Sequence, residues 1–242
     1  MTEGKKVQKM FGGIAGRYDL TNLLLSGGIC RFWALCLARK VRKVRPESVA
    51  DLATGSGDIA FLLRKKLSAG TRISAYDFCA PMLAIARARQ ERFLARMAKE
   101  GRGNLPLVRF EEGDCLNLPI ADNSLDALTI AYGVRNFEDR EKGLKEMLRV
   151  LKPGGHAFIL EFSQPTKLFR PFYYFYLKFV LPIFAAVITG DKGAYEYLRD
   201  SIAAFPHRDR FSEELRKAGF ENVEAEPYTF SIVAIHRAQK PL

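Results

Sequence analysis

Three parts of the sequence contain residues that could bind a nucleotide-like cofactor. Residues 51–58 read DLATGSGD, and Gly55 and Gly57 in this glycine loop allow a tight turn against which a nucleoside can lie. Asp77 follows Gly57 by 20 residues, and its carboxylate could accept hydrogen bonds from both hydroxyls of a ribose. Asp114 follows a further apolar segment. The loop by itself is compatible with NAD and with S-adenosylmethionine.

Each of these features also has a structural explanation. The glycine loop could be a plain tight turn, and Asp77 could cap the helix that begins near Pro81. Asp114 could stabilise a turn after Gly113. Because strand, loop, helix and acidic residue occur in the order that a cofactor site requires, we favour cofactor binding.

The hydrophobic pattern predicts the elements that position these residues. From residue 46 onward, short apolar segments alternate with amphipathic helices, which is typical of a parallel α/β sheet. We expect strands at 48–52, 72–76, 107–111, 125–131 and 156–162, and helices at 29–44, 58–67, 81–98, 139–151 and 212–218. The KPGG segment at 152–155 should end a helix before the next strand begins.

The last two predicted strands, 224–228 and 230–236, are separated by almost nothing and should pair as an antiparallel hairpin. A mostly parallel sheet that closes with such a hairpin is typical of class I methyltransferases, whereas a dinucleotide-binding Rossmann sheet is parallel throughout. The sequence therefore predicts an α/β class I (Rossmann-like) fold with a mostly parallel seven-stranded sheet and a C-terminal antiparallel hairpin.

Charge and composition limit the kinds of partner. The chain of 242 residues carries a net charge of +11, and its first 45 residues, with ten basic and two acidic side chains, account for +8. Such a basic segment suits an anionic surface, either nucleic acid or lipid headgroups, unless it is simply solvated. The four cysteines form no CxxC pair and the three histidines are scattered, which argues against a zinc site.

The apolar segments bear on location. The N-terminus shows no secretory signal, and the most apolar tract, 169–190, is interrupted by Arg170, Pro171, Lys178 and Pro182. It therefore falls short of the roughly 18 consecutive apolar residues of a membrane-spanning helix. We expect a cytoplasmic protein that contacts the inner face of a membrane peripherally and does not cross it.

Four further motifs make the sequence resemble a known family. They are YDLTNLLLS at 18–26, GVRN at 133–136, RVLKPGG at 149–155 and LEFS at 160–163. Together they are similar to the UbiE/MenG family of quinone-biosynthesis C-methyltransferases. The resemblance runs from about residue 7 to residue 240 and includes an aromatic-rich insertion at 165–206.

The resemblance implies an activity and a domain plan. A methyl group would pass from S-adenosylmethionine, without a metal, to a ring carbon of a polyprenylated quinol. The acceptor is either demethylmenaquinol, which we favour, or the 2-polyprenyl-6-methoxy-1,4-benzoquinol of ubiquinone synthesis. The plan is a basic helical arm at 1–45 and a methyltransferase domain at 46–242, whose 165–206 insertion covers the substrate. The implied partners are the quinol and a membrane surface but no nucleic acid, and a homodimer is compatible with both.

The resemblance also places cofactor contacts by position. They fall on Ser56, Asp77, Asp114, Cys115 and Ala131, the last at a position where the family usually has Ser. We add the glycine-loop residues Asp51, Gly55 and Gly57 to this set. Two further departures are Cys30, where the family commonly has His, and Ser231, where Gly is frequent.

The catalytic candidates follow the predicted strand 125–131. Arg135 and Asn136 should lie at the carboxyl edge of the sheet, facing the methyl group of the cofactor. A guanidinium stays protonated, so Arg135 would stabilise a developing phenolate directly or through a water rather than act as base. Asn136 would orient the ring and Tyr18 would close the acceptor side. Alternatively, Arg135 pairs with an acid such as Glu161 to hold the loop.

Two other functions compete with this interpretation. An RNA methyltransferase would explain the basic charge, but the segment AYGVRN at 131–136 lacks the Asp/Asn-Pro-Pro-aromatic motif that holds base amino groups. A non-catalytic membrane-binding module would use the basic helix and the insertion, but it leaves Asp77 and Asp114 unexplained. The surplus of aromatic residues at 172–179 instead indicates an apolar tunnel for the acceptor.

Overall fold

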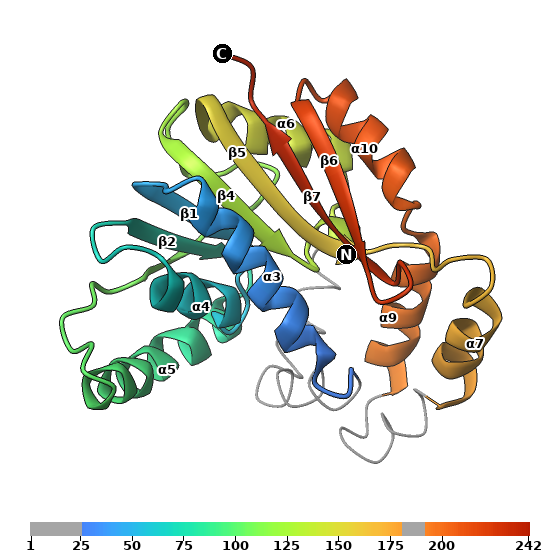
Figure 1. The fold of residues 1–242 in the computed structure, drawn as a ribbon, viewed down its shortest axis with the longest axis horizontal. Coiled ribbons are helices and arrows are strands. Elements are labelled where there is room, and N and C mark those ends of the chain that lie inside the picture. The colour runs from blue at the N-terminus through green and yellow to red at the C-terminus, as the bar shows by residue number, and fades with distance from the viewer. Residues whose placement is uncertain (1–25, 181–191) are drawn as a thin grey trace.

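The computed structural model describes residues 26–180 and 192–242, which form a twisted central sheet with helices on both sides (Figure 1). Within these residues the sheet has seven strands in the order β3-β2-β1-β4-β5-β7-β6. They are β1 (Ser48–Leu52), β2 (Arg72–Asp77), β3 (Arg109–Glu112), β4 (Leu125–Ala131), β5 (Leu151–Phe162), β6 (Glu221–Tyr228) and β7 (Val233–Gln239). The pairs among β1 to β5 are parallel, and β7 pairs antiparallel with β5 and β6. The predicted sheet is confirmed.

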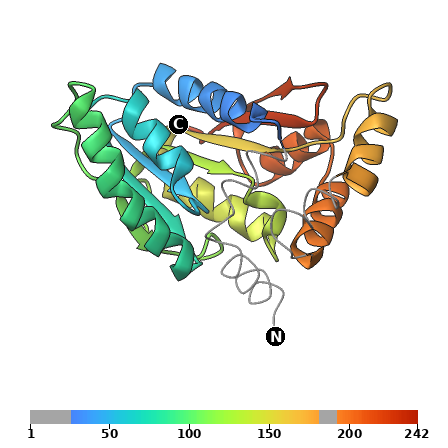
Figure 2. The ribbon, with the colours of Figure 1, turned by 90° about the horizontal axis from the view of Figure 1, so that it is seen from below.

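Helices cover both faces of this sheet. They include α3 (Ile29–Lys43), α4 (Asp58–Lys66), α5 (Ala80–Lys99), α6 (Arg140–Val150) and α10 (Arg208–Lys217). Side chains of α3, α4 and α5 join one buried apolar core, and those of α6 and α10 join a second. Figure 2 shows α3, in blue, and α6, in yellow-green, on opposite sides of the sheet. Strand β1 serves both cores, because Val49 belongs to the first and Ala50 to the second.

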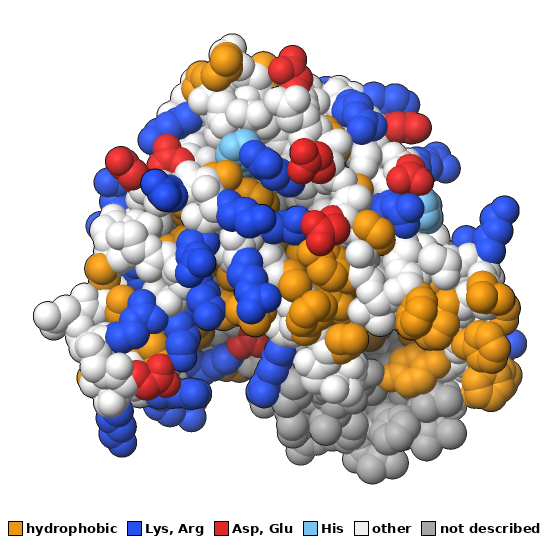
Figure 3. All heavy atoms as spheres, in the orientation of Figure 1, with side chains coloured by type: hydrophobic (Ala, Val, Ile, Leu, Met, Phe, Trp, Pro, Cys, Tyr) orange, Lys and Arg blue, Asp and Glu red, His pale blue; other side chains and the backbone are white. Residues whose placement is uncertain are grey.

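Helix α3 matches the prediction for residues 29–44 and buries Trp33, Leu37 and Val41. On the face in Figure 3, Lys and Arg side chains gather over α3 and α4. The rest of the predicted arm, residues 1–25, including Tyr18, lies outside the described residues. None of the helices at 26–180 and 192–242 has the length and apolar character needed to cross a membrane.

The predicted start of the strand at residue 156 is wrong. Strand β5 begins at Leu151 and includes the KPGG segment, although α6 does end at Val150, close to the prediction. Leu125 of β4 pairs with Leu151, and Ala127 already pairs with His156. The extra residues form a bulge, in which Gly154 adopts a φ of +75° that favours glycine.

The C-terminal hairpin is antiparallel as predicted, but its two strands are not contiguous. Tyr228 pairs with Val233, so residues 229–232 form a loop where the sequence predicted almost none. Three of its residues, Thr229, Phe230 and Ser231, adopt positive φ values of 48°, 54° and 67°. These conformations are uncommon for side chains other than glycine, and the residue types therefore did not indicate the loop.

Helix α10 also begins earlier than predicted, at Arg208 rather than Ser212. The ring of His207 accepts a hydrogen bond from the Asp209 amide at its N-terminus, which explains the earlier start. Gly219, with φ +105°, follows the helix as predicted.

The insertion consists of α7 (Arg170–Phe175), the π-helix η2 (Tyr176–Val180) and α9 (Lys192–Ala204) in its described part. Gln164 ties its beginning to its end. The amide of Gln164 donates to the Phe205 carbonyl at 2.9 Å and accepts from the Tyr174 hydroxyl at 2.7 Å. Gln164, which follows β5, thus holds α7 and the segment after α9 together at the carboxyl end of this strand.

His236 of β7 should make the fold sensitive to acid. Burial lowers the pKa of His236 to about 4. Its ring packs edge-on against the Phe211 ring, with 4.9 Å between the two ring centroids. Because the unfolded chain binds this proton more readily, stability that is present above about pH 6.5 is lost as the pH falls toward 4. We expect this loss to be about 2–3 kcal/mol.

Urea unfolding at pH 7, 5.5 and 4 would measure the effect. A His236→Gln variant should lose less stability on acidification than the parent, whereas His207→Asn, at a partly exposed position, should follow the parent. Equal pH dependence in the parent and in His236→Gln would contradict the assignment.

Candidate cofactor and acceptor site

The glycine loop leaves the carboxyl end of β1 and leads into α4. Gly55 and Gly57 have φ values of +56° and +89°, as a turn built on glycine requires. A Cβ atom on Gly57 would lie 2.9 Å from the Phe61 ring. The predicted tight turn is therefore confirmed, and at Gly57 both the backbone and the packing require glycine.

Asp77, at the end of β2, fixes this loop. One carboxylate oxygen accepts the Gly55 amide at 2.8 Å and the other accepts the Cys79 amide at 2.8 Å. Asp77 is buried, and burial raises the pKa of its carboxyl group. The predicted alternative, that Asp77 caps helix α5, is wrong, because the N-cap of α5 is Cys79 and Asp77 instead makes a turn that ends at Cys79. Each oxygen of Asp77 accepts one hydrogen bond from the protein, whereas the two oxygens of a carboxylate can together accept about four.

Asp51 lies beneath the loop and is almost fully buried. Its carboxylate accepts hydrogen bonds from the hydroxyls of Thr54 and Thr129, both at 2.6 Å. Burial raises the pKa of Asp51 to about 7, despite these two hydrogen bonds. Asp51 thus joins β1, the loop and β4.

Asp114 and Cys115 follow β3. Asp114 is exposed and accepts the Leu116 amide at 2.8 Å, so the turn that was its alternative explanation is present. Cys115 is buried, and burial raises the pKa of its thiol to about 12. The Cys115 thiol therefore stays protonated at neutral pH and is a packing group rather than a nucleophile.

A cavity of about 1670 Å³ brings most of the predicted site residues together. Those that line it are Asp51, Gly55, Ser56, Asp77, Asp114, Cys115, Ala131, Arg135 and Asn136. Gly57 does not line it. The cavity continues from the glycine loop into an apolar chamber between α3 and the insertion, lined by Trp33, Phe169, Tyr173, Tyr176 and Leu177. One space thus joins the glycine-loop half, where the predicted cofactor contacts lie, to an aromatic half.

Arg135 follows β4 in the short 3-10 helix η1 (Val134–Asn136) and forms a buried ion pair. Its Nη1 lies 2.8 Å from Oε1 of Glu161 and donates to the Tyr132 carbonyl at 2.6 Å. The side chains of Arg135 and Glu161 are 4% and 0% exposed. The Arg135 guanidinium also lies over the Phe162 ring, 5.1 Å from the ring centroid. The predicted alternative, pairing with Glu161, is therefore realised at a residue that also lines the cavity.

Asn136 is held from two directions. Its side-chain oxygen accepts the hydroxyl of Tyr197 at 2.9 Å, and its amide nitrogen lies 3.3 Å from the Tyr132 carbonyl. Tyr197 belongs to α9, so the insertion makes a direct contact with the end of β4. Tyr197 is one of several aromatic residues in the predicted insertion, and no role was predicted for it from the sequence.

Arg89 of α5 is a second residue that sequence reasoning missed. It donates to the Ser56 carbonyl at 3.1 Å and pairs with Asp58 at 2.5 Å, so it holds the glycine loop in place, and it also lines the cavity. Helix α5 contains several arginines, and nothing in the sequence distinguishes this one.

Comparisons with known proteins agree with this geometry. Residues 1–240 match the model of the ubiE/COQ5 methyltransferase family. A demethylmenaquinone methyltransferase of Thermus thermophilus is 42% identical over 233 residues, which cover 96% of this chain and 100% of the relative. The ubiquinone/menaquinone biosynthesis C-methyltransferase UbiE of Geotalea daltonii is 37% identical over 239 residues, which cover 98% of this chain and 97% of the relative.

Solved structures show the same fold. A SAM-dependent methyltransferase of Thermotoga maritima, described as a possible histamine N-methyltransferase, superposes with a TM-score of 0.63 at 22% identity. The match covers 96% of this chain and 98% of that one. The class I methyltransferase fold expected from the strand pattern is therefore confirmed.

The Arg135–Glu161 pair should be important for stability. Replacing Glu161 by Ala leaves the Arg135 guanidinium buried without its counter-ion, which typically costs 3–5 kcal/mol, and we expect a loss of about that size. Denaturant unfolding would measure it, with Glu141→Ala in an exposed ion pair as the control, expected to change stability by less than about 1 kcal/mol. Equal losses in the two variants would show that the buried pair has no special role.

Proposed function

The chain belongs to the ubiE/COQ5 methyltransferase family, and from that premise we propose that it methylates a ring carbon of a polyprenylated quinol with S-adenosylmethionine. The reaction serves menaquinone or ubiquinone biosynthesis, and demethylmenaquinol is the favoured acceptor because several relatives are named demethylmenaquinone methyltransferases. The observation that carries the proposal is the single cavity in which the glycine loop and Asp77 lie beside an aromatic chamber.

The residues of the cofactor half suit S-adenosylmethionine. When bound, its sulfonium supplies an electrophilic methyl group. The Asp77 carboxylate would receive the ribose hydroxyls with the acceptor sites that Gly55 and Cys79 leave unused. Asp114 and Cys115 would contact the adenine, and Ala131 would line the wall between the two halves. A Cβ atom on Gly133 would lie only 2.8 Å from Ala53, so glycine also keeps the backbone close on this side.

The aromatic half suits the quinol. Trp33 of α3 is fixed by its hydrogen bond to the Thr229 hydroxyl at 2.9 Å, and Tyr173 of α7 is buried in the same apolar core. Flat apolar walls of this kind accept a flat ring and the first units of a prenyl tail. An acceptor of this chemistry resides in lipid, so we propose that the protein acts in the cytoplasm at the inner face of the membrane.

The ring carbon becomes nucleophilic as the quinol hydroxyl loses its proton. We assign Arg135 to stabilise the developing phenolate, directly or by holding the water that takes the proton. Glu161 and the Phe162 ring hold the Arg135 guanidinium in place, so the ion pair would position the group that stabilises the phenolate. Asn136, held by Tyr197, would orient the ring. Tyr18 keeps its proposed place at the acceptor side.

An assay with labelled S-adenosylmethionine and a short-chain demethylnaphthoquinol under reducing conditions tests the activity. An Asp77→Asn variant should bind S-adenosylmethionine roughly 10- to 100-fold more weakly, because the ribose loses a charge-assisted acceptor of about 1.5–3 kcal/mol. Glu112→Gln, at an exposed carboxylate outside the cavity, is the matched control and should bind like the parent.

Calorimetry decides the outcome. Unchanged affinity in a folded Asp77→Asn variant would remove Asp77 from the cofactor site. Tighter binding of NAD than of S-adenosylmethionine by the parent would refute the proposed cofactor, and the absence of label transfer to any quinol would refute the function.

The role of Arg135 requires a separate experiment. If it stabilises the phenolate, Arg135→Ala should lower kcat by roughly 10²–10³-fold while the Kd of S-adenosylmethionine changes little. The double variant Arg135→Met/Glu161→Gln removes both charges and avoids a buried unpaired carboxylate. If the double variant regains the parent kcat, Arg135 only holds the loop; if turnover stays low in a folded double variant, the catalytic assignment is supported.

A further inference from the structure

Helix α7 and its continuation η2 are apolar on two opposite sides. The inner side packs into the protein, with Tyr173 and Leu177 buried. The outer side carries Phe172, Phe175 and Phe179, which are 68%, 61% and 50% exposed. Leu168, in the turn before α7, is 86% exposed. Phe172 and Phe175 are three residues apart in α7, and Phe179 follows four residues later in η2, so the three rings lie near one another along the helical segment. A water-facing helix normally carries polar side chains there.

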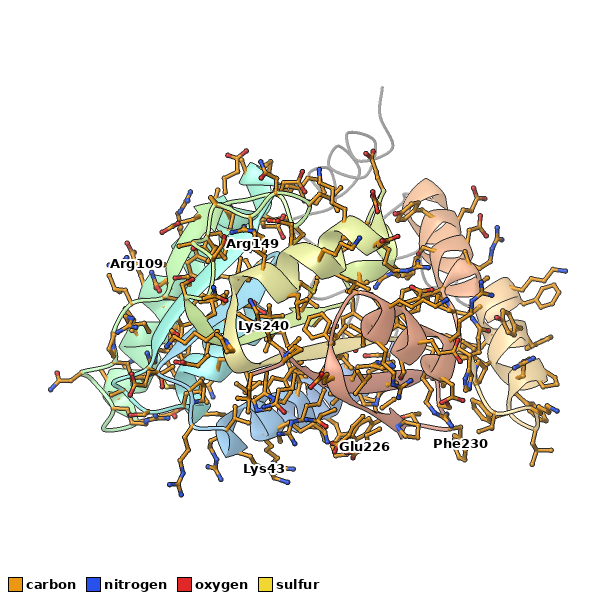
Figure 4. All side chains as sticks on the ribbon, turned by 90° about the horizontal axis from the view of Figure 1, so that it is seen from above. Lys43, Arg109, Arg149, Glu226, Phe230 and Lys240 are labelled. Atoms are coloured by element: carbon orange, nitrogen blue, oxygen red, sulfur yellow. The ribbon has the colours of Figure 1, made fainter. Side chains whose placement is uncertain are left out.

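The loop between β6 and β7 extends this surface. Phe230, at its tip, is 64% exposed and stacks on Phe169 with 4.7 Å between ring centroids, and Phe169 in turn contacts Phe172. Figure 3 shows hydrophobic side chains gathered over α7, and Figure 4 shows Phe230 at the outer edge of the molecule. We call Leu168, Phe172, Phe175, Phe179 and Phe230 the aromatic face.

The charged side chains of residues 165–180, which supply most of the aromatic face, have one sign. Residues 165–180 contain Lys167, Arg170 and Lys178 and no acidic residue. The ammonium of Lys178 lies 5.4 Å from the Phe179 ring centroid, so cation and ring are presented together. Aromatic rings beside cations suit the interfacial layer of an anionic bilayer. A symmetric contact with a second copy would instead bring these cations close to their own equivalents.

The aromatic face is also connected to the cavity. Phe172 belongs to the face and lines the cavity, and Ile29, 36% exposed, lines the same cavity from α3. Leu168, Phe175, Phe179 and Phe230 do not line it. The prediction that the aromatic residues at 172–179 form the acceptor tunnel is therefore wrong for Phe175 and Phe179. The cavity therefore reaches the surface at the face, while most residues of the face take no part in the site.

We propose that the aromatic face is the membrane-docking surface, which inserts into the interfacial layer of an anionic bilayer and takes the prenylated acceptor laterally from lipid at Phe172. The apolar tail then stays in lipid while the ring enters the chamber. This inference rests on the proposed function only for the identity of the acceptor.

Vesicle binding and turnover together test the proposal. The Phe175→Ser/Phe179→Ser variant changes only residues outside the cavity, and Leu107→Ser, at an exposed leucine before β3, is the matched control. On phosphatidylcholine vesicles with 30% phosphatidylglycerol, we expect the double variant to bind about tenfold or more weakly than the parent and the control. Added salt should weaken binding of the parent.

The substrates separate docking from catalysis. Turnover of a long-tailed demethylmenaquinol in the vesicles should fall in the double variant in parallel with binding, whereas turnover of a short-chain quinol in solution should equal that of the parent. Near-ultraviolet circular dichroism and a thermal melt confirm that the variant is folded. A short-chain rate that falls equally would show a role in the site and overturn the docking role.

Two other outcomes would overturn the proposal. Unchanged vesicle binding in the double variant would show that the face does not contact lipid. If the parent sediments as a dimer that the double variant abolishes, with vesicle binding unaffected, the face is an interface between copies. Failure of the proposed function gives a different result. The parent would then methylate neither quinol, while the double variant would still bind vesicles more weakly than the parent.

Discussion

The buried carboxylate of Asp77 is the constraint on which the site depends. It takes one amide from the glycine loop and one from the residue that precedes α5, and so it joins the ends of two neighbouring strands and the starts of two helices. A shift in the end of β2 would therefore move the loop and the helix together. Because these hydrogen bonds form within the protein, the loop is already shaped before a ligand arrives.

A second buried acid performs the same task on the acceptor side. Glu161, at the end of β5, accepts the backbone amide of Arg135 at 3.2 Å as well as its guanidinium, and also the Phe162 amide at 2.8 Å. The ends of β4 and β5 are thereby locked to each other, as β1 and β2 are by Asp77. Each acid fixes the segment that follows a neighbouring strand, so the carboxyl edge of the sheet is held rigidly beside the aromatic walls of the chamber.

Those parts of the fold and the site that depend on residues close together in the chain could be predicted from the sequence. β4 has the predicted bounds, and the glycine loop has the predicted backbone, because apolar runs and glycine act locally. The errors lie where tertiary contacts dominate. Thr229 adopts a positive φ that its residue type disfavours, and its hydroxyl is held by Trp33, which lies 196 residues earlier. Likewise, Tyr197 reaches Asn136 across 61 residues, a contact that no local pattern indicates.

The position of β7 affects the order in which the chain can fold as it is synthesised. β1 to β4 and their helices lie within the first 131 residues, so this half of the sheet can form early on the ribosome. β7, the last strand in sequence, lies between β5 and β6. Until residue 239 has emerged, β5 has an unpaired edge and β6 has no partner. The aromatic chamber, which Thr229 and Ile232 of the β6–β7 loop help to line, is therefore completed late, and until then the nascent chain carries an exposed strand edge that could pair with another chain.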